Sequence, residues 1–188
     1  MIKIGITGSI ASGKTTASKI ISKGRGPIFS ADKVVQELYQ TRRFKNLIYK
    51  TFKINNKNQT KKYLRKFIFE NKNNLKKLEK IIHPLVRKQM IRFTLQNKHK
   101  KKLFYEIPLL IESKLTNYFN VIILIKSKKS IRLRRFKLKN RNIKLFEYLN
   151  KKQISVNKKI KFCDHVVVNE KNLKFLKKSL LDIIKNYE

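Results

Sequence analysis

The chain has 188 residues, of which 41% are hydrophobic, and this length allows one domain with a buried core and a modest insertion. It carries 48 Lys and Arg against 11 Asp and Glu, a formal net charge of +37. No apolar run approaches the roughly 18 residues that span a bilayer, and the start is too short for a signal peptide. We therefore expect a soluble, cytoplasmic protein, and the single cysteine, Cys163, fits a reducing compartment.

Short apolar runs alternate with helical segments along the chain. The expected strands are residues 2–7, 27–29, 103–107, 121–125 and 165–168. The expected helical segments are 14–22, 31–96 with breaks near 55–58 and 71–74, 130–139, 144–154 and 173–184. This alternation predicts an α/β fold with a parallel sheet that is covered by helices on both faces. The helical stretch from about 33 to 96 would be an insertion on that core.

A phosphate-binding pattern follows the first apolar run. The pattern G-x-x-x-x-G-K-[ST] is complete in Gly8, Ser9, Ile10, Ala11, Ser12, Gly13, Lys14 and Thr15. Its glycines allow the backbone to wrap amides around phosphate oxygens, and the helix that begins here adds a favourable dipole. Lys14, which we expect on an exposed loop, would contact the β- and γ-phosphates, and Thr15 would bind Mg²⁺. We therefore predict that the chain binds a nucleoside triphosphate.

The phosphate loop alone does not distinguish a kinase from a GTPase or a motor ATPase. Motors usually need a larger body, and no Asn-Lys pair, such as Asn150-Lys151, is followed by the Asp of a guanine signature. A small-molecule kinase is therefore favoured. A nucleic-acid-binding protein that uses the +37 charge is the alternative from another class. However, the lysines are spread from Lys3 to Lys185, which favours a compositional bias over a binding face.

Several polar residues at expected strand ends are candidates for chemistry. Asp32 follows the second strand and would be either a base for the attacking hydroxyl or a helix N-cap. Glu106 and Glu112 would bind Mg²⁺ through water, bind substrate, or be surface acids paired to one of the many lysines, and Asp164 is interpreted as structural. Four arginines on or near one basic segment would close over the triphosphate or form a solvated face: Arg132, Arg134, Arg135 and Arg141. The pair His83-Pro84 predicts a kink or a new helix start.

Together these motifs resemble the dephospho-coenzyme A (dephospho-CoA) kinase family along nearly the whole chain. In chain order they are the phosphate loop with Thr16, Ser30-Ala31-Asp32, His83-Pro84, Pro108-Leu109-Leu110 with Glu112, and Gln153 followed by Asp164 and Asn169. The family has Asp-Ala-Asp where this chain has Ser30-Ala31-Asp32, and two further loop glycines where it has Ser9 and Ala11. Another small kinase, for a nucleoside or a nucleotide, would not be expected to carry these motifs in this order.

The resemblance implies a single P-loop kinase domain over residues 1–188, with a helical acceptor-binding insertion at about 33–96 and a small lid at about 130–155. It implies ATP, Mg²⁺ and transfer to the ribose 3′-hydroxyl of dephospho-CoA, the last step of coenzyme A synthesis. It implies that Asp32 is the catalytic base and that Lys14 also takes part in catalysis. It assigns acceptor contacts to His83, Pro108, Leu109 and Glu112.

The same resemblance assigns ATP contacts to the phosphate loop, to a lid arginine and to Asn169 near the adenine. We take Arg135 as the lid arginine, although the family also has an arginine shortly before the glutamine, where this chain has Leu149, Asn150, Lys151 and Lys152. Thr15 would be the metal ligand. We expect a monomer that binds no specific nucleic acid and no membrane.

Overall fold

The computed structural model describes residues 1–53, 72–139 and 142–188. The chain divides into two compact units, one formed by Met1–Ser30 with Thr94–Glu188 and the other by Ala31–Phe93. Within the described residues, no helix combines the length and the apolar character that a membrane crossing requires.

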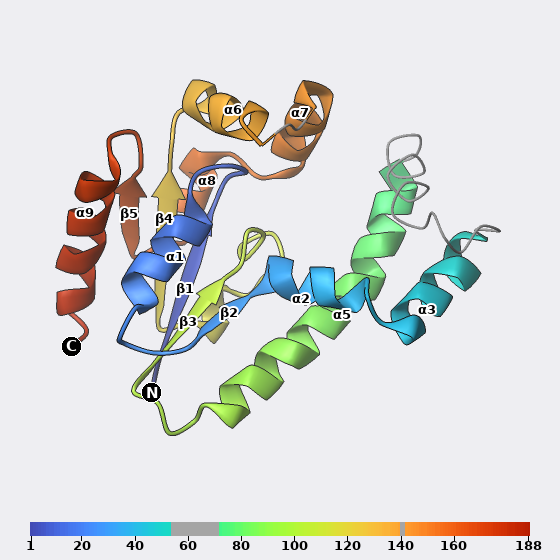
Figure 1. Cartoon of the computed structure of the whole chain (residues 1–188), viewed down its shortest axis with the longest axis horizontal. Helices are drawn as coiled ribbons and strands as arrows, with labels where there is room; N and C mark the ends of the chain where they lie inside the picture. Colours follow the sequence, from blue (N-terminus) through green and yellow to red (C-terminus); the bar gives the residue numbers. More distant parts are fainter. Residues whose placement is uncertain (54–71, 140–141) are drawn as a thin grey trace. The chain divides into compact units, whose positions relative to one another are not determined.

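The larger unit is built on one parallel sheet of five strands (Figure 1). Its order is β2-β3-β1-β4-β5, and the strands are β1 (Ile2–Gly8), β2 (Ile28–Ser30), β3 (Lys102–Glu106), β4 (Val121–Lys126) and β5 (His165–Val168). Each expected strand is confirmed to within one residue at either end. The agreement follows from burial on both faces, which turns a parallel strand into a nearly continuous apolar run.

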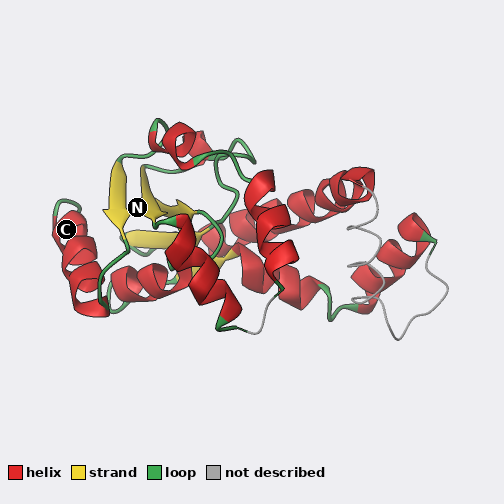
Figure 2. Ribbon diagram, turned by 90° about the horizontal axis from the view of Figure 1, so that it is seen from above, coloured by secondary structure: helices red, strands yellow, loops and turns green. Residues whose placement is uncertain are grey.

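Helices flank the sheet in this unit, and the predicted α/β fold is confirmed (Figure 2). They are α1 (Lys14–Ser22), α6 (Lys129–Lys137), α7 (Ile143–Lys152), α8 (Val156–Ile160) and α9 (Leu173–Lys185), with a short 3₁₀ turn η2 (Thr116–Tyr118). Helices α1 and α9 share an apolar core with the strands, whose buried members include Ile6, Ile21, Ile123 and Leu180. The sequence did not predict α8, which packs against β4 and is too short to show a helical period.

The smaller unit is helical and has a core of its own. It contains α2 (Ala31–Leu38), α3 (Arg42–Phe52) and α5 (Lys72–Gln96), whose last residues belong to the larger unit. Phe44, Ile48, Phe52 and Leu78 form the buried cluster. The chain also breaks between α2 and α3, where Thr41 caps α3 by accepting from the Phe44 N–H at 3.3 Å. That break was not predicted.

Two expectations about the helical stretch change in the structure. Pro84 lies inside α5, so the interpretation of His83-Pro84 as a new helix start is wrong. Ile82 and Leu85 on either side of Pro84 pack on the same apolar cluster, which supports the helix where proline removes one hydrogen bond. Of the expected breaks, 55–58 and Asn71 lie outside the described residues, and the break expected at 71–74 is wrong for residues 72–74, which are helical.

Candidate active site

The phosphate loop connects β1 to α1 and is shaped by left-handed backbone angles. Gly13 caps α1 with φ 98°, and a Cβ there would collide with the side-chain nitrogen of Asn169. Ala11 also has a positive φ of 58°. A residue with a Cβ adopts this conformation at a cost of about 1–2 kcal/mol, which explains why the family pattern has glycine at this position.

Lys14 is the first residue of α1, and its side chain is turned back over the loop. Its Nζ donates to the Ser9 carbonyl at 3.0 Å, and the residue is only 8% exposed, so the expectation of an exposed loop position is wrong. Ser12 Oγ is buried and has no hydrogen-bond partner within the described residues. A buried hydroxyl in the same loop as a lysine ammonium and a helix N-terminus fits a phosphate group, because each of them stabilises negative charge there.

A hydroxyl and a carboxylate meet beside the loop. Thr15 Oγ1 donates to Glu106 Oε1 at 2.5 Å, and Glu106 is buried at the carboxyl end of β3. Thr15 and the next residue, Thr16, are exposed on the first turn of α1. Oxygen ligands of this kind suit Mg²⁺. The two candidate carboxylates therefore differ: Glu106 bonds to Thr15, the expected metal ligand, whereas Glu112 pairs with Lys159.

The loop residue Ile10 is held by side chains from two later segments. Its N–H donates to Gln153 Oε1 at 2.8 Å, and its carbonyl accepts from Arg132 Nη1 at 3.4 Å. The same guanidinium donates to Asn150 Oδ1 at 2.8 Å and to the Ser127 carbonyl at 3.1 Å. Burial lowers the pKa of Arg132, and the opposing effect of the nearby Glu147 carboxylate is smaller. The guanidinium nevertheless keeps its charge, as it does in proteins generally.

Arg135 and Asn169 contact the opposite end of the loop. Asn169 Nδ2 donates to the Ser12 carbonyl at 2.8 Å, and Arg135 Nη1 donates to the same carbonyl at 3.3 Å. Arg135 Nη2 also donates to Asn169 Oδ1 at 3.4 Å. Two cationic side chains of α6, Arg132 and Arg135, therefore reach the phosphate loop.

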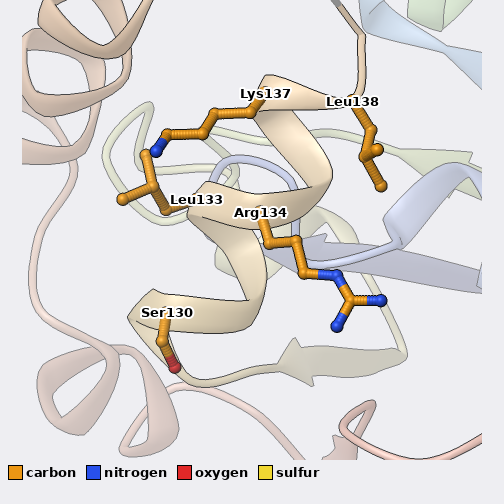
Figure 3. Close-up of a pocket in the computed structure, with 5 residues that line it drawn as sticks. All are labelled: Ser130, Leu133, Arg134, Lys137 and Leu138. Atoms are coloured by element: carbon orange, nitrogen blue, oxygen red, sulfur yellow. The ribbon is translucent and has the colours of Figure 1, made fainter.

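Among the described residues, the candidate Arg134 makes none of these contacts. Arg134 is exposed and points away from the axis of α6 into a surface pocket that Ser130, Leu133, Lys137 and Leu138 also line (Figure 3). Arg141 lies outside the described residues.

The turn after β3 is tied to both β1 and α8. The Pro108 carbonyl accepts from Thr7 Oγ1 at 3.2 Å, and Leu109 is half-buried beside it. Glu112 Oε1 accepts from Lys159 Nζ at 2.8 Å and from the Ile154 N–H at 3.2 Å. Glu112 therefore does pair with a lysine, as one alternative had it, but the pair is not at the surface, since the side chains of Lys159 and Glu112 are 0% and 15% exposed.

Two predicted residues belong to the smaller unit. Asp32 is exposed in the first turn of α2. Because α2 begins at Ala31, the N-cap interpretation of Asp32 is wrong. His83 is half-buried on α5. Asp164 is structural as expected, since its Oδ2 accepts from the Ile122 N–H at 2.7 Å and joins β5 to β4.

Sequence reasoning missed Ser127, Asn150 and Lys159. Ser127 follows β4 directly, so the rule that ligands bind at the carboxyl ends of parallel strands could have indicated it. Asn150 and Lys159 carry no local signal, because similar residues occur throughout α7 and α8.

We predict that Asn169→Ala lowers the affinity for ATP about tenfold, because the Ser12 carbonyl loses its shortest partner and Arg135 loses another. Isothermal titration calorimetry measures the affinity. Asn157→Ala, an exposed change on α8, is the control and should bind as the wild type does. Equal affinity of Asn169→Ala and the wild type would contradict the assigned contact.

The family model and the curated relatives agree on one family. The model of the dephospho-CoA kinase family matches residues 2–174. A dephospho-CoA kinase from Fusobacterium nucleatum is 35% identical over 185 residues, with 94% of each chain covered. One from Bartonella quintana is 33% identical over 188 residues, covering 97% of this chain and 96% of its own. A solved dephospho-CoA kinase from Campylobacter jejuni shares the fold, with a TM-score of 0.69, 24% identity, and coverage of 98% of this chain and 96% of its own.

Proposed function

The chain belongs to the dephospho-CoA kinase family, and from that premise we propose how its residues catalyse the reaction. The activity is the ATP-dependent phosphorylation of dephospho-CoA, the last step of coenzyme A biosynthesis. We propose that the acceptor is the ribose 3′-hydroxyl. The observation that carries the assignment of roles is the phosphate loop with Lys14 folded over it and Thr15 paired with Glu106.

In this proposal the triphosphate lies along residues 8–16. Lys14 leaves the Ser9 carbonyl for the phosphate oxygens, which are better partners for an ammonium group because they are charged. Ser12 Oγ, which lacks another partner within the described residues, donates to a phosphate oxygen. Thr15 would hold Mg²⁺, with Glu106 accepting behind it, and the ion would neutralise charge on the β- and γ-phosphates.

The lid segment at about 130–155 supplies positive charge from the other side. Arg135 lies beside the Ser12 carbonyl and Arg132 beside the Ile10 carbonyl, so both guanidinium groups are near the path of the phosphates. We propose that Arg135, which is less buried, contacts ATP, and that Asn169 orients it near the nucleotide. Arg132 keeps the loop and the lid together.

We propose that the helical insertion at about 33–96 binds the acceptor, and that His83, Pro108, Leu109 and Glu112 are acceptor contacts, as the family resemblance implies. The hydroxyl oxygen of dephospho-CoA attacks the γ-phosphorus, the bond to the β-phosphate oxygen breaks, and ADP leaves. The Asp32 carboxylate accepts the proton of the hydroxyl. We further propose that the enzyme works as a cytoplasmic monomer with no specific nucleic acid or membrane partner.

The test is a panel of acceptors. We expect ADP to form with ATP and dephospho-CoA and not appreciably with nucleosides or nucleotides, because the acceptor motifs are those of the dephospho-CoA kinase family. A coupled assay that measures ADP follows the reaction for each acceptor at equal concentration. Equal or greater turnover with a nucleoside would refute the assignment.

A further inference from the structure

One lysine of the larger unit is buried much more deeply than its neighbours. Lys159 is 0% exposed, although Lys158 beside it on α8 and Lys161 after it are exposed. Within the described residues, the other buried cationic side chains are Lys14 and Arg132. Both of those contact the phosphate loop, whereas Lys159 has no part in the reaction as described so far.

The ammonium group of Lys159 lies against the turn that follows β3. Its Nζ is 2.8 Å from Glu112 Oε1 and donates to the Pro108 carbonyl at 3.5 Å. Thr7 Oγ1 donates to the same carbonyl at 3.2 Å. Because Thr7 directly precedes the phosphate loop, Lys159 is joined to the start of that loop through a single carbonyl oxygen.

A second route leads from Lys159 to the loop. Glu112 Oε1, which Lys159 holds, also accepts from the Ile154 N–H at 3.2 Å. The preceding residue, Gln153, accepts from the Ile10 N–H at 2.8 Å. A continuous series of contacts therefore runs from Lys159 through Glu112 and the Gln153–Ile154 peptide to the phosphate loop.

Stability alone does not account for this ion pair. An apolar pair of similar volume is often as stable as a buried salt bridge, because desolvation offsets the attraction of the charges. A buried pair with good geometry does fix the positions of the groups it joins. Glu112 Oε2 is buried without a hydrogen-bond partner within the described residues, so this carboxylate depends on the ammonium group of Lys159 for its neutralisation.

We propose that Lys159 is a positioning residue for phosphoryl transfer. It holds Glu112, and Glu112 holds the Gln153–Ile154 peptide so that Gln153 fixes Ile10 of the phosphate loop. The inference rests on the proposed function in one respect, the binding of ATP by this loop. In this role Lys159 keeps the backbone N–H groups of the phosphate loop in place before ATP binds. Groups fixed in advance need no rearrangement when charge develops during the reaction.

A double-mutant cycle of Lys159→Met and Gln153→Ala tests the proposal. Each single variant should lower ATP affinity and turnover about tenfold, the effect of losing one hydrogen bond of this series. The double variant should lose no more than either single one, because both changes break the same series of contacts. ATP affinity is measured by calorimetry and turnover with dephospho-CoA, both well below the thermal midpoint. Lys158→Met, an exposed change on the same helix, is the control and should behave as the wild type does.

If the losses of affinity in the two single variants multiply in the double variant, the proposal is overturned. Free-energy changes add in this way when two residues act independently. If Lys159→Met does not fold, the charge-neutral variant with Lys159→Met and Glu112→Leu replaces it, since it leaves no carboxylate uncompensated and no side-chain acceptor for the Ile154 N–H. That variant should bind ATP as weakly as Gln153→Ala does, and wild-type affinity would overturn the proposal. ATP affinity does not depend on the acceptor, so a wild-type enzyme that fails to phosphorylate dephospho-CoA would refute the proposed function alone.

Discussion

Replacing Lys14 with alanine is expected to lower turnover with dephospho-CoA about a hundredfold to a thousandfold, the effect of losing one preorganised charge-stabilising donor. Lys14 begins α1 and places its ammonium group over the phosphate loop, 3.0 Å from the Ser9 carbonyl. A phosphoryl group in transfer carries its charge on oxygens that this group would reach, and water cannot replace a cation fixed by the fold. The assay measures ADP formation with saturating ATP and dephospho-CoA.

The same change should also lower the thermal midpoint slightly, because Lys14 is buried and its bond to Ser9 is lost. A loss of 1 kcal/mol corresponds to a shift of about 2–4 °C for a chain of this size. Lys19→Ala, an exposed change on the same helix, is the matched control and should leave turnover unchanged. Near wild-type turnover in Lys14→Ala would refute the role of this lysine.

Asp32→Asn is expected to lower turnover at least tenfold while ATP affinity stays the same. Asparagine keeps the size of the side chain but cannot accept the proton of the attacking hydroxyl. General-base catalysis contributes about a hundredfold to ten-thousandfold, and a loose transition state places the effect toward the lower end. Calorimetry with ATP and turnover with dephospho-CoA separate binding from chemistry.

Asp32 also contributes a negative charge to the first turn of α2, where it is exposed. Its interaction with the helix dipole contributes about 0.3–1 kcal/mol, so the thermal midpoint should move by no more than a few degrees. Glu37→Gln, an exposed change on the same helix, controls for the loss of charge and should retain wild-type turnover. If Asp32→Asn also retains turnover, Asp32 is not the base.

Much of the nucleotide site could be predicted from the sequence because it is local. Gly8 to Thr15 are consecutive, and their spacing prescribes a turn between a strand and a helix. The sheet could be predicted for a related reason, since strands buried on both faces must be apolar throughout, as 121–125 is. Helix boundaries could be predicted less well, because a proline favours a break where apolar packing favours a continuous helix. At Pro84 the packing of α5 overrides the local preference of proline.

Only the tertiary structure decided which of many similar side chains reach the site. Arg132, Arg134 and Arg135 are equivalent in sequence, yet packing of α6 turns the first and third toward the phosphate loop and the second toward solvent. Gln153 is 143 residues from Ile10, the residue it holds. Lys159 is one of 48 basic residues, and its burial is visible only once α8 lies against β4. The direction of a side chain depends on the elements packed around it, and no local pattern records those neighbours.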